Sequence, residues 1–295
     1  MRVFVTGATG FIGSAVVREL IGAGHQVLGL ARSDAGAQSL AAAGAQIHRG
    51  DLQDLESLRS GAAAADAVIH TAFRHDDWSK FAESCDMDKR AIEVIGTALE
   101  GSSRPFLVSS GVGVAQGRAA TEDDPPLSSP SFPRVSEATA VALMERGVNA
   151  SVMRLPQVHD TVKQGLVTPL IAIARAKGVS AYIGDGANRW PAAHVTDVAQ
   201  LYRLALEKGT AGARYHAVAE EGVALKDIAT AIGHGLNVPV TSISQEQAQE
   251  HFGFLGFFAG RDAHISSAQT RAKLGWNPVG PTLLTDLENM QYTQA

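Results

Sequence analysis

The stretch MRVFVTGATGFIGSAVVREL, residues 1–20, decides the fold. β-Branched and aromatic residues over 2–6 predict a strand, and apolar residues three and four apart over 11–22 predict a helix. Between them, Gly7 permits a tight turn, Gly10 lets an outside group approach the backbone, and Gly13 allows the helix to pack close to the strand. A bare strand-to-helix turn is the alternative, but in this context the motif favours a dinucleotide whose pyrophosphate lies at the helix N-terminus. The residues expected to contact it are Thr6, Gly7, Thr9, Gly10, Phe11, Ile12 and Gly13.

Short apolar runs and helical patterns alternate through the first half of the chain. Strands are predicted at 2–6, 25–30, 45–48, 66–70, 105–109 and 149–154. Helices are predicted at about 11–22, 35–43, 54–61, 80–100 and 134–147. Six such βα steps predict an α/β fold, a Rossmann-type doubly wound parallel sheet.

The second half predicts a smaller substrate-binding lobe. A helix is expected at about 165–177, a Gly-rich loop at YIGDGANRW, and another helix at 195–208. We therefore expect a Rossmann domain over 1–158, with chain returns near 190–220, and the lobe over 159–295. The Pro- and Ser-rich segment 119–134 is predicted to be a flap beside the ligand cleft.

Composition limits the partners of this chain. The 295 residues are 45% hydrophobic and carry a net charge of −5 without a basic block, which argues against nucleic acid. Cys85 is the single cysteine, so no internal disulfide forms, and we expect it to be a buried small residue. No run has the length of a signal peptide core or a membrane span, so we expect a cytoplasmic protein that does not bind membranes. The scattered histidines predict no metal site.

The end of the second predicted strand indicates which dinucleotide binds. It reads LGLARSD, and Arg32 with Ser33 favours the 2′-phosphate of NADP over NAD. Asp34 could still reach back to a ribose hydroxyl, and Arg32 could be plain surface. After the third strand, Asp51 is expected to bind the adenine amino group, to cap the next helix, or both, and Leu52 to cover the adenine ring. Small residues after the fourth strand let the backbone run beside the cofactor at Thr71, Ala72 and Phe73.

Together these residues resemble the extended short-chain dehydrogenase/reductase superfamily, in its NAD-dependent epimerase/dehydratase and 3β-hydroxysteroid dehydrogenase-like branch. The matching pieces, in the family's order, are TGATGFIG at 6–13, DL at 51–52, HTA at 70–72, LVSS at 107–110, RLPQVHD at 154–160, HVTD at 194–197 and LGWNP at 274–278. The resemblance implies a C-terminal substrate lobe and cofactor contacts from Ser109 and Pro156. It also makes a homodimer through the helices near 80–100 and 134–147 an expectation.

The family's proton relay is missing from this sequence. The resemblance implies a Ser after the fifth strand, matched by Ser110 or, less well, by Ser109, followed by Tyr and, four residues later, Lys. The four tyrosines are Tyr182, Tyr202, Tyr215 and Tyr292, and no lysine lies between residues 89 and 163. If the SE of SFPRVSEATA takes the place of the family's SK, Pro133 stands at the Tyr position and Glu137 at the Lys position.

Several side chains are candidates to replace the relay. Ser110 is expected to orient the reacting oxygen, and a proton could come from water, His75 or Tyr182. Arg134 and Glu137 are expected either to form an i,i+3 ion pair or to take part in catalysis. Structural roles are favoured for three further residues: His159, His194 with Asp197 capping the helix after it, and Trp190 as an interlobe wedge.

The predicted function is that of an atypical NADP-dependent oxidoreductase. It would reduce a carbonyl, or a similarly activated double bond, on a small organic substrate. Two alternatives stay open: a non-catalytic NAD(P)-binding redox sensor or scaffold, and a sugar-nucleotide epimerase/dehydratase-like enzyme.

Overall fold

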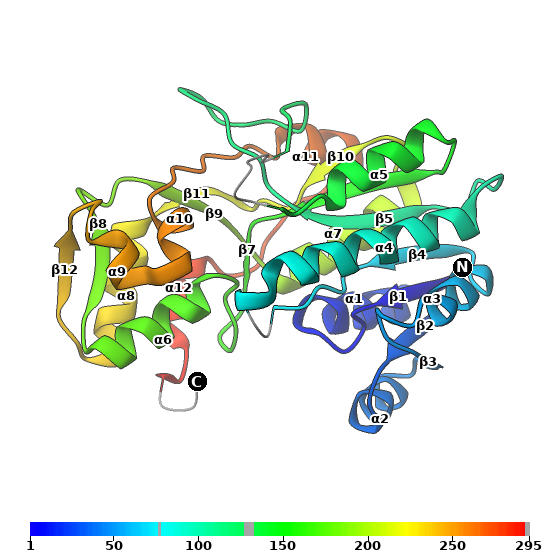
Figure 1. Cartoon of the computed structure of the whole chain (residues 1–295), viewed down its shortest axis with the longest axis horizontal. Helices are drawn as coiled ribbons and strands as arrows, with labels where there is room; N and C mark the ends of the chain where they lie inside the picture. The colour runs from blue at the N-terminus through cyan, green and yellow to red at the C-terminus, as the bar shows by residue number, and fades with distance from the viewer. Residues whose placement is uncertain (76–77, 127–132, 293–295) are drawn as a thin grey trace.

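A seven-stranded sheet, in which every strand runs parallel to its neighbours, forms the centre of the computed structural model (Figure 1). The structure describes residues 1–75, 78–126 and 133–292. The strand order is β10-β6-β5-β4-β1-β2-β3, so the direction of winding reverses between β1 and β4. A crevice at the carboxyl ends of the strands is expected at such a reversal. The strands are β1 (Arg2–Thr6), β2 (Gln26–Ala31), β3 (Gln46–Arg49), β4 (Ala67–His70), β5 (Phe106–Gly111), β6 (Ala150–Leu155) and β10 (Arg214–His216).

Helices cover both faces of this sheet. Because strand side chains alternate between faces, Val3 and Val5 pack with α1 and α7, whereas Phe4 packs with Leu58 and Ile92 on the other side. The first face carries α1 (Phe11–Gly22) and α7 (Val195–Lys208), and α2 (Asp34–Ala42) lies beside β2 and β3. The second face carries α3 (Leu55–Ala63), α4 (Phe81–Leu99) and α5 (Ser136–Glu145).

The rest of the chain builds a second body with its own apolar core, on the left of Figure 1. In one small sheet β9 (Arg189–His194) lies between β7 (Gln157–His159), which is parallel to it, and β11 (Glu220–Ala224), which is antiparallel. In another, β8 (Ser180–Ile183) pairs with β12 (Val240–Ile243). The remaining elements are α6 (Val167–Lys177), α8 (Leu225–Leu236), α9 (Ala248–Phe252), α10 (Gly256–Ala259), α11 (Ala268–Leu274), α12 (Leu283–Asn289) and the 3-10 helices η1 (Trp78–Lys80) and η2 (Gly253–Leu255).

The predicted elements of the first half agree with the structure to within about two residues at each end. The segment over 119–134 differs from expectation, because its described first part is fastened. Ala120 exchanges backbone hydrogen bonds with His264 and Ser266, and Glu122 is buried against Thr270. A free flap is therefore not supported for residues 119–126. Residues 127–132 lie outside the described part.

The expectation for the single cysteine is met. Cys85 is buried, and burial raises the pKa of its thiol to about 11, so it is not an activated nucleophile. In the described part of the chain, no helix combines the length and apolarity that crossing a bilayer requires. The domain division at residue 158 stays a prediction. Both α7 and β10, which come from the range 190–220 where chain returns are expected, pack with the first domain.

Candidate functional site

The three motif glycines serve different purposes. Gly7 adopts φ +67°, and a Cβ on it would lie 2.7 Å from the backbone nitrogen of Ala72. A Cβ on Gly13 would overlap the carbonyl oxygen of Gly7, so this glycine lets α1 approach β1. A Cβ on Gly10, in contrast, would meet one atom within 4 Å, the Gly7 oxygen at 3.2 Å. Packing therefore explains Gly7 and Gly13, while the space beside Gly10 is left for an outside group.

The N-terminus of α1 offers backbone donors to that group. Gly10 is its N-cap and provides no side-chain cap, and the first turn holds no acidic residue. The amides of the first turn are therefore available to an anion. Two residues that were predicted to contact the dinucleotide bond within the protein instead. The Thr6 hydroxyl lies 2.7 Å from Nδ1 of His70, and the Thr71 hydroxyl donates to the Thr6 carbonyl. Thr9 instead lies beside Gly36, at the start of α2.

Arginines lie at the ends of two neighbouring strands, Arg32 directly after β2 and Arg49 at the end of β3. Arg32 is 74% exposed and lies 3.8 Å from Asp51, and Arg49 donates to Asp34 over 2.6 Å. The pairing with Arg49 occupies Asp34, the residue that could have bound a ribose hydroxyl. Ser33 caps α2 through the amide of Gly36.

The expected cap at Asp51 is wrong. Asp54 is the N-cap of α3 and accepts from the Ser57 amide, whereas Asp51 accepts from the Gln53 amide in a turn. The other Asp51 oxygen lies 3.8 Å from Nε of Arg32. Leu52 packs partly against the apolar core between the large sheet and helices α3, α4 and α5.

The serines at the end of β5 face opposite sides of the sheet. The Ser109 hydroxyl donates to the His70 carbonyl over 2.5 Å and lies 2.6 Å from the Tyr202 hydroxyl. Burial raises the pKa of Tyr202, so this phenol stays protonated. By strand alternation Ser110 lies on the face covered by α4 and α5, and its hydroxyl bonds to no described residue. Pro156 lies between β6 and β7.

The sequence analysis missed a series of buried, hydrogen-bonded side chains that leads to the carboxyl ends of the sheet strands. The His70 ring binds Thr6 through Nδ1 and Asp88 through Nε2, and Ser136 donates to the other Asp88 oxygen over 2.5 Å. Asp88 is 1% exposed. Burial raises its pKa, but hydrogen bonds from His70 and Ser136 and the charges of His70 and Arg134 outweigh burial and leave the pKa below its usual value. One sequence signal could have found it: Asp88 falls among the buried, mostly apolar positions of α4, where a charged residue needs partners.

Arg134 is the last side chain in this hydrogen-bonded series, and it lies at the carboxyl ends of β4 and β5. Its Nε donates to the Ser136 hydroxyl over 2.9 Å, and one terminal nitrogen lies 3.4 Å from the Ser109 carbonyl oxygen. Its guanidinium carbon lies 4.4 Å from the centre of the Phe73 ring. In the described part of the chain, no carboxylate binds Arg134 directly. A cation is thus held beside Phe73 and Ser109 without a direct counter-ion.

The expected i,i+3 ion pair between Arg134 and Glu137 is wrong. Arg134 precedes α5, and Glu137 turns away from it into a buried ion pair with Arg154, whose side chain is 0% exposed. Two hydrogen bonds of 2.8 and 2.7 Å join Glu137 to Arg154, and Arg214 adds one of 2.7 Å. The carboxylate at the position of the family's Lys is therefore structural.

Two predicted proton donors lie in different places. His75 is exposed, and its ring centre lies 4.6 Å from that of Phe73, beside the β4 end. Tyr182 is on β8, packed against Gly186 with Lys226 5.8 Å from its ring centre. Since β8 lies at the far end of the second body (Figure 1), the structure does not bring Tyr182 to His75 and Ser110.

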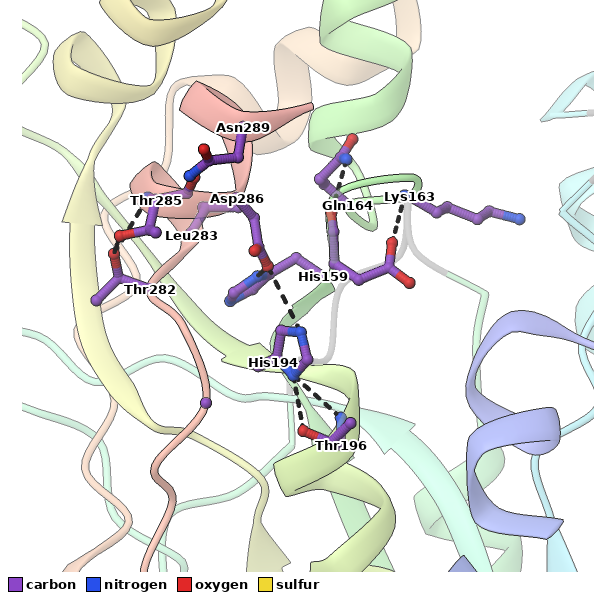
Figure 2. Close-up of polar contacts among 12 residues, drawn as sticks. His159, Lys163, Gln164, His194, Thr196, Thr282, Leu283, Thr285, Asp286 and Asn289 are labelled. Atoms are coloured by element: carbon purple, nitrogen blue, oxygen red, sulfur yellow. Dashed lines mark hydrogen bonds and ion pairs between the residues drawn. The ribbon is translucent and has the colours of Figure 1, made fainter. Parts of the chain in front are cut away.

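The predicted structural histidines surround Asp286 (Figure 2). His159 is fully buried, and its Nδ1 lies 2.7 Å from that carboxylate, while Nε2 of His194 lies 3.8 Å away. His194 itself caps α7 at Thr196, so the expected cap at Asp197 is wrong. Asp197 accepts instead from the amides of Val279 and Gly280.

The last two expectations concern Trp190 and a metal site. Trp190 is 3% exposed and lies inside the apolar core of the second body rather than between the lobes, and its Nε1 donates to the Phe258 carbonyl. In the described ranges, no group of three or more His, Cys, Asp or Glu side chains is placed to hold a metal ion.

Known proteins resemble this chain in sequence and in fold. The model of the NAD dependent epimerase/dehydratase family matches residues 3–131. An uncharacterized protein of Schizosaccharomyces pombe is 50% identical over 99% of this chain and 100% of its own length. The chain belongs to the NAD-dependent epimerase/dehydratase family. This family binds NAD(P). The similarity of this chain to a dehydrogenase and a reductase supports an oxidoreductase-like enzyme.

More distant proteins resemble this chain in sequence or in fold. A 2-alkyl-3-oxoalkanoate reductase of Stenotrophomonas maltophilia is 28% identical over 72% of this chain and 67% of its own. The solved UDP-glucose 4-epimerase of Thermus thermophilus, in complex with NAD, has a TM-score of 0.77 at 19% identity and covers all of both chains. Its likeness shows the shared fold, a Rossmann-type parallel sheet.

Proposed function

We propose that this chain is an NADP-dependent oxidoreductase that reduces a carbonyl, or a similarly activated double bond, on a small organic substrate. One observation carries the proposal: Arg134 is held at the ends of β4 and β5, the sheet edge that also carries the open glycine turn at Gly10. The relative that is a 2-alkyl-3-oxoalkanoate reductase supports a carbonyl substrate.

The chain's own residues fit the dinucleotide. The first-turn amides of α1 would bind the pyrophosphate, and the space beside Gly10 lets it approach. Arg32, with Arg49 beside it, would bind a 2′-phosphate, while Asp34 is engaged by Arg49. When bound, NADPH supplies a hydride to the substrate.

Arg134 replaces part of the missing relay. A guanidinium does not lose its proton near neutral pH, so Arg134 would donate hydrogen bonds to the substrate oxygen and stabilise its developing negative charge. Ser136 and Asp88 orient it through Nε. Ser110 would hold the same oxygen, and the proton would come from water or from exposed His75.

Arg134→Met is expected to lower kcat/KM for carbonyl reduction by about 10²- to 10³-fold, as loss of a charge-stabilising donor does. The assay follows NADPH oxidation with a panel of aldehydes, ketones, quinones and imines. Ser110→Ala should lower turnover in the same assay, and NADPH affinity should stay unchanged in both variants. Arg90→Met, an exposed arginine on α4, is the matched control. Unchanged kcat/KM in Arg134→Met would remove Arg134 from the mechanism.

Arg32→Glu tests the choice of cofactor. The substitution places a negative charge where the 2′-phosphate would bind, so it should weaken NADPH binding at least about tenfold and NADH binding far less. Calorimetric titration measures both affinities. The control is Arg18→Glu, which makes the same charge change on the exposed side of α1. Equal losses for the two cofactors would sink the assignment of Arg32.

A redox sensor or scaffold is the second candidate, and one observation favours it. The carboxylate at the relay's Lys position, Glu137, is locked in a buried ion pair and has no part in proton transfer. A sensor would bind NADPH tightly, yet consume none of it with any member of the carbonyl panel.

A further inference from the structure

A cluster of aromatic rings lies beside Arg134 and spans both bodies of the protein. Phe73 follows β4, Trp78 begins η1, Phe81 begins α4, and Phe254 comes from η2 in the C-terminal body. Ring centres of Trp78 lie 4.3 Å from Phe254 and 5.4 Å from Phe81, both in stacked orientations. Phe73 lies 5.8 Å from Phe81. We name Phe73, His75, Trp78, Phe81 and Phe254 the aromatic shelf.

The shelf is only partly buried. Phe254 is 41% exposed, Phe73 and Trp78 are half-buried, and His75 is exposed. The other two tryptophans, Trp190 and Trp276, are almost fully buried. Large stacked rings that stay open to solvent together are uncommon in a monomer and mark a surface that binds something apolar.

The chemistry at one end of the shelf narrows what it binds. The Arg134 guanidinium lies over the Phe73 ring at 4.4 Å, and the Ser136–Asp88–His70 chain fixes its Nε. Nη1 of Arg134 has no acceptor among the described residues. A ligand that suits both features has a flat ring system for the shelf and an oxygen acceptor at the edge of that ring system.

We propose that the aromatic shelf binds a planar aromatic carbonyl compound, an aryl ketone or a quinone, whose ring stacks on the shelf and whose carbonyl oxygen accepts from Arg134. This inference names the substrate class of the proposed reductase and rests on that function for turnover. Binding itself requires no hydride transfer.

The test compares two ketones that differ only in the ring: 2-acetylnaphthalene, which is flat, and 2-acetyldecalin, which is saturated. Their affinities are measured by calorimetry on the full chain saturated with NADP⁺, which carries no hydride to donate. The flat ketone should bind about tenfold more tightly. Phe254→Ala and Trp78→Ala should each weaken it by about 3- to 10-fold, the range of one aromatic contact, and leave the saturated ketone unchanged.

Two further variants complete the test. Arg134→Met should weaken both ketones, because both carry the carbonyl, whereas Val279→Ala, at a position 81% exposed, is the control that should change neither. If Trp78→Ala does not fold, Phe254→Ala still tests the shelf, since its side chain is already exposed. Equal affinity for the two ketones, or equal losses for both in Phe254→Ala, would overturn the proposal. Failure of the reductase function has a separate sign: the flat ketone binds, but NADPH is not consumed.

Discussion

The buried ion pair of Glu137 excludes this side chain from proton transfer. If the SE of SFPRVSEATA takes the place of the family's SK, Glu137 stands at the position of the catalytic Lys, and it could have been catalytic itself. In the structure it is 2% exposed and bound by Arg154 and Arg214. The sequence could not reveal this, because Arg154 lies on β6 and Arg214 on β10, and their approach depends on the sheet order.

Restoring the family's motif is therefore expected to fail. Glu137→Lys would bury a cation against two arginines and leave Arg154 without its partner, which should cost about 3–5 kcal/mol of unfolding free energy. Adding Pro133→Tyr should not rescue activity. Urea unfolding measures the loss, and Glu145→Lys, an exposed position on the same helix, is the control for the charge change. A Glu137→Lys variant as stable as this control would contradict the structural role.

Asp88 predicts a pH dependence of stability. Its folded pKa lies below the ordinary value of 3.8, so its ionised form stabilises the fold above that pH. This contribution is lost as the pH falls through the folded pKa. Asp88→Asn does not titrate, so the gap in unfolding free energy between the native chain and this variant should be largest at pH 7 and shrink towards pH 3. A gap that is constant over this range would contradict the assignment.

At the scale of elements, the sequence predicted regular βα steps well and irregular ones poorly. The helix over 11–22 has the predicted ends because its apolar spacing and the preceding glycines fix them. The small strands β7, β9 and β11 were missed, since three to six residues show little alternation and β9 contains Pro191. The Asp54 cap was also missed, because Asp51 and Asp54 are both suitable capping residues a few positions apart.

The contact between α12 and β7 is expected to stabilise the C-terminal body. Asp286→Ala would remove the partner of buried His159, whose other nitrogen already lacks a hydrogen bond, and should cost about 2–3 kcal/mol. Thermal and urea unfolding measure the effect. Glu288→Ala, exposed on the same helix, should change little. Equal stability of the two variants would show that the Asp286 cluster in Figure 2 is not a structural contact.

At the scale of the whole molecule, sheet order decided which residues meet. The βα alternation predicted that the ends of the first, second, fourth and fifth strands share one edge, and that edge carries Gly10, Arg32, Phe73 and Ser110. It could not predict that Asp88 and Ser136, from two helices on the same face, join His70 to Arg134. Phe254 was equally hidden, because it reaches Trp78 from a distant part of the chain.

Assembly and location stay predictions. A homodimer through α4 and α5 is expected from the family resemblance, although the outer face of α4 carries the exposed pairs Lys89–Glu93 and Arg90–Asp86, which suit contact with water. Light scattering of the purified chain would give its mass in solution.

The central claim is that the dinucleotide at Gly10 reduces a carbonyl held beside Arg134. Transfer of deuterium from NADPH labelled at the nicotinamide C4 tests it most directly, with 2-acetylnaphthalene or any other reactive carbonyl as acceptor. Mass spectrometry of the product should find one deuterium on the carbon of the new alcohol, and Arg134→Met should slow its appearance. If NADPH deuterated at both C4 positions binds, no aldehyde or ketone in the panel acquires deuterium, and no quinone consumes NADPH, the chain is not the proposed reductase.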